Sequence, residues 1–182
     1  MPETRHSTNR RLAGILVPVF SIRGEDDLGI GDVSSLREFV QFASEAGFGF
    51  VQLLPINETG PDNSPYNAIS SVAIEPMTLD CSTDGLQDLS DEDFTGIISQ
   101  YDLKALNAGG VNYATVRELK HKLLRKAYEG FLANVQGKVD IRAEAFEAFC
   151  ETESDWLNDY CVFRLFMDRE GGSQVWQGWA ES

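Results

Sequence analysis

The sequence has few of the residues from which metal sites and disulfide frameworks are built. Its 182 residues include only three cysteines and two histidines. The number of cysteines is odd, no CxxC pair occurs, and neither His6 nor His121 has a neighbouring partner typical of a metal site. We therefore expect no disulfide framework, no metal and no cofactor. Three ordinary buried thiols, at Cys81, Cys150 and Cys161, are typical of a reducing compartment.

Basic residues and long apolar runs are also scarce. The chain has 15 Lys and Arg against 29 Asp and Glu, a net charge of -14. A surface this acidic should repel nucleic acid and anionic lipid, but it is compatible with neutral ligands such as sugars. No run approaches the roughly 20 apolar residues that span a bilayer, and the N-terminus is polar as far as Arg11, without a signal peptide. We predict a cytoplasmic protein with neither nucleic acid nor membrane as partner.

The patterns that are present predict a parallel β-α-β unit. The apolar runs at 12–20 and 48–56 are typical of strands covered on both faces, and Pro18 is expected to end the first. Between them, residues 35–46 carry an apolar stripe at helical spacing, from Leu36 to Ala43. The crossover should be right-handed and the two strands parallel.

Ligands of such a unit bind beyond the carboxyl ends of its strands. This places residues 20–27 and 57–67 side by side. The glycines at Gly29 and Gly31 resemble part of a phosphate loop, but the full GxGxxG spacing and a P-loop lysine are missing. We interpret them as a tight turn into the helix, with Asp32 or a nearby serine as the cap.

The second half of the chain is predicted to be mainly helical. One long helix is expected over 111–135, capped by Asn112, and further helix over 140–167 with a break around 152–155. Basic residues of the long helix are expected on a solvated face: Arg117, Lys120, Lys122 and Arg125. Two parallel strands alone leave open edges and little core, and a closed (β/α)8 barrel needs about 250 residues. The sequence alone therefore suggests that part of the fold is missing.

The loop at 60–68 is the best candidate for a binding site. Pro65 fixes its own φ and biases Ser64 toward an extended shape, which holds Tyr66 in one direction. A tyrosine ring suits the apolar face of a sugar, and Ser64 or Asn67 can hydrogen-bond its hydroxyls. A rigid turn whose tyrosine packs inward is the alternative.

Four carboxylates lie near the predicted ligand face: Asp26, Asp27, Glu58 and Asp62. A pair about 5–5.5 Å apart would suit a retaining glycosidase. Loop acids more often cap helices or remain solvated, so the solvated or capping interpretation is preferred for each of them.

Residues 12–80 resemble the start of the 4-alpha-glucanotransferases known as amylomaltases or disproportionating enzymes. The resemblance is carried in order by Gly14-Ile15-Leu16, Leu28-Gly29-Ile30-Gly31-Asp32, Leu53-Leu54-Pro55 and Ser64-Pro65-Tyr66. Weaker similarity continues through 113–131, 156–160 and 176–179. The combination is specific, although each motif alone is modest.

This resemblance implies an α/β fold, the start of a (β/α)8 TIM barrel. Residues 1–80 would form the first part of the barrel with its substrate-binding loop, and residues 81–182 a mainly helical subdomain. The implied activity is transfer of α-1,4-glucan segments to a glucose or maltodextrin acceptor by a retaining mechanism.

The resemblance also assigns roles to residues. Ser64 and Tyr66 match positions that line the donor side of the glucan cleft, and Asn67 lies beside them. The catalytic aspartate and glutamate of the family come from later strands, so no residue of this chain is expected to be catalytic and the chain alone should be inactive. The alternative is a non-catalytic glucan-binding or interaction module that is complete at this length.

Overall fold

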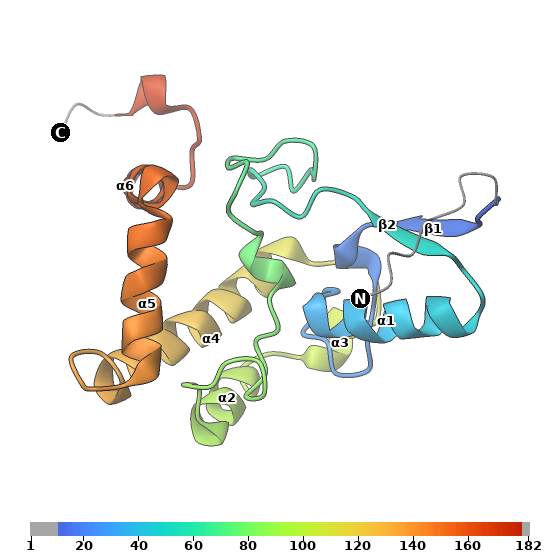
Figure 1. Ribbon diagram of the computed structural model, residues 1–182, viewed down its shortest axis with the longest axis horizontal. Coiled ribbons are helices and arrows are strands. Elements are labelled where there is room, and N and C mark those ends of the chain that lie inside the picture. Colours follow the sequence, from blue (N-terminus) through green and yellow to red (C-terminus); the bar gives the residue numbers. More distant parts are fainter. Residues whose placement is uncertain (1–10, 180–182) are drawn as a thin grey trace, which may run out of the picture.

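The computed structural model describes residues 11–179, so His6 lies outside the described part. It contains a two-stranded sheet followed by a mainly helical region (Figure 1). The strands are β1 (Gly14–Val17) and β2 (Phe50–Leu53). The α-helices are α1 (Val33–Glu45), α2 (Asp91–Ile98), α3 (Leu103–Asn107), α4 (Tyr113–Asn134), α5 (Ile141–Thr152) and α6 (Ser154–Arg169). Three single 3-10 turns complete the elements: η1 (Val19–Ser21), η2 (Pro76–Thr78) and η3 (Trp176–Gly178).

The predicted β-α-β unit is confirmed. β1 and β2 pair in parallel, in the register Gly14 to Phe50 through Val17 to Leu53, and α1 forms the crossover between them (Figure 1). β1 ends immediately before Pro18, because proline has no N–H to give to a strand ladder. The two strands therefore end at one edge of the sheet, and the chain leaves that edge toward both candidate loops.

The expectation that the strands are covered on both faces is wrong for one face. Successive side chains of a strand point to opposite faces, and here they alternate between exposed and half-buried. Leu16 is 59% exposed and Phe50 48%. α1 packs against β2, and a single helix can cover only one face of a sheet. The other face remains an open apolar surface.

The core is built around α4, which crosses the middle of the molecule (Figure 1). Leu119 and Leu123 of this helix are fully buried. Their cluster joins segments from both halves of the chain: Leu28, Cys81, Leu89, Leu106 and Ala127. A second cluster packs Val116 of the same helix against Ile30 and Met77. The sheet end of the molecule and the helical region thus share a core.

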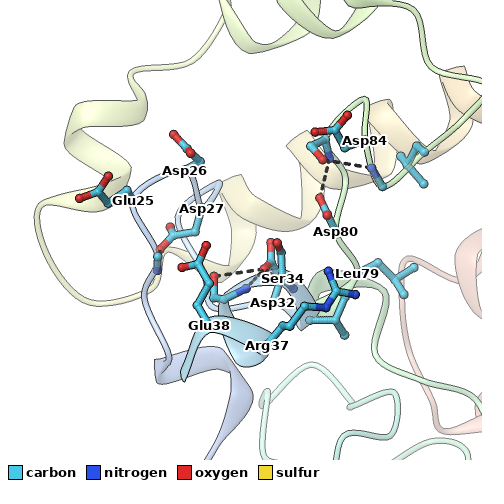
Figure 2. Close-up of a pocket in the computed structure, with 16 residues that line it drawn as sticks. Glu25, Asp26, Asp27, Asp32, Ser34, Arg37, Glu38, Leu79, Asp80 and Asp84 are labelled. Carbon is cyan, nitrogen blue, oxygen red and sulfur yellow. Dashed lines mark hydrogen bonds between the residues drawn. The ribbon is translucent and has the colours of Figure 1, made fainter. Parts of the chain in front are cut away.

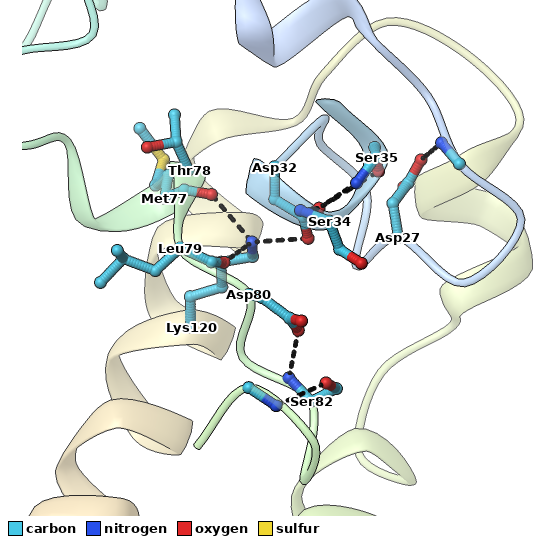
Figure 3. A network of polar contacts seen from close by, with 12 residues as sticks. Asp27, Asp32, Ser34, Ser35, Met77, Thr78, Leu79, Asp80, Ser82 and Lys120 are labelled. Atoms are coloured by element: carbon cyan, nitrogen blue, oxygen red, sulfur yellow. Dashed lines mark hydrogen bonds and ion pairs between the residues drawn. The ribbon is translucent and has the colours of Figure 1, made fainter. Parts of the chain in front are cut away.

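Lys120 of α4 is completely buried, so the prediction of a solvated basic face is wrong for this residue. Its Nζ donates to Met77 O at 2.8 Å and to Leu79 O at 2.7 Å. It also lies 3.6 Å from Oδ2 of Asp32 (Figure 3). The ammonium is buried because these three oxygens replace its water. Arg125, on the same helix, is solvated as expected.

The break between α5 and α6 falls at residue 153, as the sequence predicts. Trp156 of α6 packs on Tyr160 with ring centroids 5.8 Å apart, and its Nε1 donates to Glu153 Oε2 at 2.5 Å. Farther along the helix, Phe163 packs on Trp179, with ring centroids 5.3 Å apart. These aromatic pairs connect α6 to its own start and to the segment that follows it.

All three cysteines are free thiols, in agreement with the prediction that they form no disulfide framework. Only Cys81 is buried; Cys150 is half-buried and Cys161 is exposed. The expectation of three buried thiols is therefore wrong for two of them, because α5 and α6 turn these positions away from the α4 core. Among the described residues, none of the helices has the length and apolar character needed to cross a membrane.

Candidate functional site

The loop that follows β2 is closed at its base by antiparallel pairing. Asn57 bridges to Ile74, and Thr59 bridges to Ala68. The buried carboxylate of Glu75 accepts hydrogen bonds from the backbone N–H of Thr59 at 2.9 Å and from its hydroxyl at 2.8 Å. The segment 57–75 contains the predicted binding residues and is called the binding loop below. It is thus a folded unit with defined geometry.

The tip of the binding loop is held together by Asp62. Its carboxylate accepts from the backbone N–H of Ser64 at 3.2 Å and from Nδ2 of Asn67 at 2.9 Å. These bonds, the one from Asn67 first, lower the pKa of Asp62 below its ordinary value. Asp62, one of the four candidate acids, thus stabilises the loop tip on an exposed surface.

Tyr66 projects from the tip into solvent, with 75% of its surface exposed. The alternative of an inward-packed tyrosine is therefore wrong. Its neighbour Pro65 instead faces the protein, in a small hollow shared with Asn63, Phe20 and Tyr113. The binding loop thus packs one side on the protein and presents the tyrosine from the other. Phe20 follows β1, so part of the expected meeting of the two strand ends is confirmed.

The tip is also tied to α4 by a hydrogen bond. Arg117 Nη2 donates to Asn63 Oδ1 at 2.7 Å. Asn63 has φ +54°, the left-handed region, which asparagine tolerates better than most side chains. Its Nδ2 donates to Pro61 O at 3.2 Å. The side-chain amide of Asn63 therefore stabilises its own turn and also joins that turn to α4.

The base of the binding loop is tied to α6 through Glu58, which is buried. Its carboxylate accepts a short hydrogen bond from the Tyr160 hydroxyl and lies 3.2 Å from Nε of Arg164. Burial raises the pKa of Glu58, against the opposing effects of Tyr160 and then Arg164. Burial and the bond to Glu58 also raise the pKa of Tyr160. This carboxylate is fully engaged in holding two segments together.

Figure 2 shows an open acidic cleft of about 780 Å³ on another part of the molecule. Asp27 in this cleft is buried, binds the Arg23 guanidinium at 2.7 Å and accepts from the backbone N–H of Gly29 at 2.9 Å. Asp32 caps α1, since its Oδ1 accepts from Ser35 N at 3.0 Å. No group of three acids, histidines or cysteines in the described residues could hold a metal. These carboxylates serve the local structure.

The four candidate acids do not come together. Asp26 and Asp27 line the acidic cleft. Glu58 lines a separate hollow of about 260 Å³ with Arg117 and Arg164. The expectation that residues 20–27 and 57–67 lie side by side therefore holds at Phe20 and fails for the acids, because Arg23 and the turn before α1 hold Asp27 on the other cleft. No glycosidase-like pair is assembled from them.

The Gly29–Gly31 segment is a tight turn, as interpreted from the sequence. The backbone N–H of Gly31, which a phosphate would need, donates to Phe20 O at 3.1 Å. A Cβ at Gly31 would stand only 2.1 Å from Val19 O. The glycine is therefore required by the close approach of two backbone segments.

Comparison with known proteins identifies the family to which the chain belongs. The family model described as 4-alpha-glucanotransferase matches residues 17–182. The chain belongs to the 4-alpha-glucanotransferase family. It is 33% identical over 170 residues to the 4-alpha-glucanotransferase of Chlamydia pneumoniae, covering 93% of this chain and 31% of that protein. It is 34% identical over 174 residues to the enzyme of Aquifex aeolicus, covering 94% and 32%.

A solved member of the family has the same fold in this region. The amylomaltase from Streptococcus agalactiae, in complex with acarbose, superposes with a TM-score of 0.70 at 29% identity. The match covers 94% of this chain and 32% of that one. The chain thus spans about a third of the length of each of these three relatives.

The sequence does not predict the residues that hold the binding loop in place. The sequence predicts a solvated position for Arg117, and it marks Glu58 only as one of several loop acids. Tyr160 and Arg164 lie about one turn apart on α6 and both meet Glu58. Their spacing on one helix face is visible in the sequence, but nothing local pairs them with Glu58, a residue 102 positions before Tyr160.

Proposed function

We propose that this chain forms one wall of the α-1,4-glucan cleft of a 4-alpha-glucanotransferase. The observation that carries the proposal is the exposed ring of Tyr66 on a loop fixed at both tip and base. The ring offers a flat apolar face to a glucosyl unit. Ser64 and Asn67, beside it, offer hydroxyl and amide groups to the sugar hydroxyls. The acarbose complex of the streptococcal amylomaltase supports a carbohydrate ligand.

The proposed reaction is a retaining transfer of glucan segments to a glucose or maltodextrin acceptor. In such a mechanism a carboxylate nucleophile and an acid–base carboxylate act in turn. We assign neither role to this chain, because its candidate acids are separated and three of them, Asp27, Glu58 and Asp62, are occupied as hydrogen-bond or ion-pair partners. Its contribution is to bind and orient the donor glucan.

We also propose that β1 and β2 are the first strands of a (β/α)8 TIM barrel. The open apolar face at Leu16 and Phe50 supports this, because a barrel strand is covered by helices on one face and by barrel-interior side chains on the other. Residues 1–80 would then be the start of the barrel and 81–182 a helical subdomain packed on it. The free thiols support a cytoplasmic location.

Maltoheptaose titration of the 182-residue chain, followed by calorimetry, tests the binding role. The Tyr66→Ala variant should bind about tenfold more weakly, since a stacked aromatic ring contributes about 1.5 kcal/mol or more when it is buried. Tyr128→Ala removes another exposed tyrosine, on α4, and should bind as the parent does. Equal affinity of the parent and Tyr66→Ala would refute the assignment.

Incubation with maltotriose tests the catalytic part of the proposal. The 182-residue chain alone should release no glucose and build no longer maltodextrins. Clear turnover would show that the catalytic groups are present after all. The mass of the native protein separates a transferase from a glucan-binding module that is complete at 182 residues.

A further inference from the structure

We propose that Arg117 of α4 is a positioning residue that fixes the tip of the binding loop and so sets the direction of Tyr66. The inference rests on the proposed glucan-binding role of Tyr66. It gives the helical region a part in substrate binding, because the direction of a loop side chain is set from a helix 54 residues away.

The contact is made at the position where the loop needs support. Asn63 has a positive φ, a conformation that costs free energy for a residue with a side chain. The Arg117 guanidinium donates to its side-chain oxygen at 2.7 Å, and a hydrogen bond from a charged donor is stronger than one between neutral groups. The contact therefore offsets the cost of the turn.

The link from Asn63 to Tyr66 is short and stiff. Only Ser64 and Pro65 lie between them. The proline ring fixes the φ of Pro65 and restricts Ser64 to extended conformations. Asn63 and Pro65 also line one hollow together with Tyr113, which lies about one turn before Arg117 on α4. A rotation at Asn63 is therefore transmitted to Tyr66.

The base of the binding loop is anchored by bonds that do not involve Arg117. Glu58 is held by Tyr160 and Arg164 of α6, and Ile69 N donates to Glu58 O at 2.8 Å. Loss of Arg117 should therefore release the tip while the base remains folded. This separates a positioning role from a general structural one.

Hydrogen exchange and maltoheptaose titration of the 182-residue chain, followed by calorimetry, test the inference together. In Arg117→Ala, the amides of Asn63 and Asn67, which bond within the tip, should exchange about tenfold faster. The amide of Ile69, at the base, should keep its rate. Maltoheptaose should bind about threefold to tenfold more weakly, because the binding-competent direction of Tyr66 is less populated.

Three matched variants sharpen the test. Arg117→Lys keeps a cationic N–H donor and should restore most of the protection and affinity. Asn63→Gly keeps access to positive φ but removes the acceptor, so it should match Arg117→Ala, and the double variant should lose nothing more. Arg125→Ala removes an 84% exposed arginine of the same helix and should change neither quantity.

Each outcome bears on the inference. Unchanged exchange of Asn63 and Asn67 in Arg117→Ala overturns it, whether or not glucan binds. Faster exchange of Ile69 to the same extent overturns it as well, since the effect is then general unfolding. Faster tip exchange with unchanged affinity rejects the positioning role. If the parent chain binds no maltoheptaose while tip exchange rises selectively, the glucan proposal fails and the hold of Arg117 on the tip stands.

Discussion

Replacement of Lys120 by methionine should destabilise the chain strongly, although the new side chain is apolar and similar in length. The ammonium of Lys120 is buried and reaches three oxygens: two backbone carbonyls, of Met77 and Leu79, and the Asp32 carboxylate (Figure 3). These join η2 and the segment after it to the start of α1. The substitution leaves two carbonyls without a donor and one buried carboxylate without its cation.

The magnitude follows from these contacts. Removal of one partner of a buried ion pair costs about 3–5 kcal/mol, most of it from the group left behind. Here Asp32 retains donors from Ser34 and Ser35, and the ammonium no longer has to be desolvated. Both effects favour the lower end, a loss of about 3 kcal/mol. At a typical urea dependence of about 2 kcal/mol per molar, the unfolding midpoint falls by about 1.5 M.

Urea unfolding followed by far-ultraviolet circular dichroism measures this loss directly. Lys122→Met is the matched control, since Lys122 is two residues away and its ammonium contacts Glu118 at the surface. Its midpoint should not change measurably. A loss below about 1 kcal/mol for Lys120→Met, or one equal to that of the control, would show that the buried ammonium contributes little beyond its volume.

Three further predictions address other parts of the chain. Burial raises the pKa of Glu58 in the folded state, so the folded state binds this proton more tightly than the unfolded state does, and the contribution of Glu58 to stability falls as the pH rises above 4.5, the ordinary pKa of a glutamate. The Glu58→Gln variant should lose this fall in stability. Identical stability profiles of parent and variant from pH 4 to 7 would contradict the argument. Burial raises the pKa of Cys81 to about 11, so a thiol reagent at pH 8 should modify exposed Cys161 first and Cys81 only on unfolding, as mass spectrometry of the labelled peptides can show. Gly31→Ala should lower the free energy of unfolding by at least about 2 kcal/mol, because its Cβ would lie 2.1 Å from the carbonyl oxygen of Val19 and 2.3 Å from that of Ile22. The control Gly96→Ala places its Cβ in open space within a helix and should be neutral or stabilising.

Local patterns were enough to predict the β-α-β unit and the long helix. Two apolar runs, one amphipathic stripe and a capping side chain at Asp32 are all encoded within a few residues of where they act. The helix α3 was missed, because five residues are too few to show a period. The loop residues Ser64 and Tyr66 could also be nominated from the local sequence, because proline and glycine mark a turn there.

The contacts that fix the site could not be predicted, because each joins distant parts of the chain. Lys120 is indistinguishable from its solvated neighbours until the carbonyls of Met77 and Leu79, some 40 residues earlier, are placed beside it. Glu58 meets Tyr160 across 102 residues. A charged side chain is assigned to solvent by default, and only the tertiary structure shows which ones have exchanged water for a partner.

The position of the tryptophans gives the molecule an optical property. All three, at 156, 176 and 179, lie beyond the core helix α4, and the sheet has none. Tryptophan fluorescence therefore reports on α6 and the segment after it, while β1, α1 and β2 do not contribute to it. Trp156 packs on Tyr160, whose hydroxyl donates to Glu58. Protonation of that carboxylate alters the electric field beside an indole, so unlabelled fluorescence can follow the base of the binding loop.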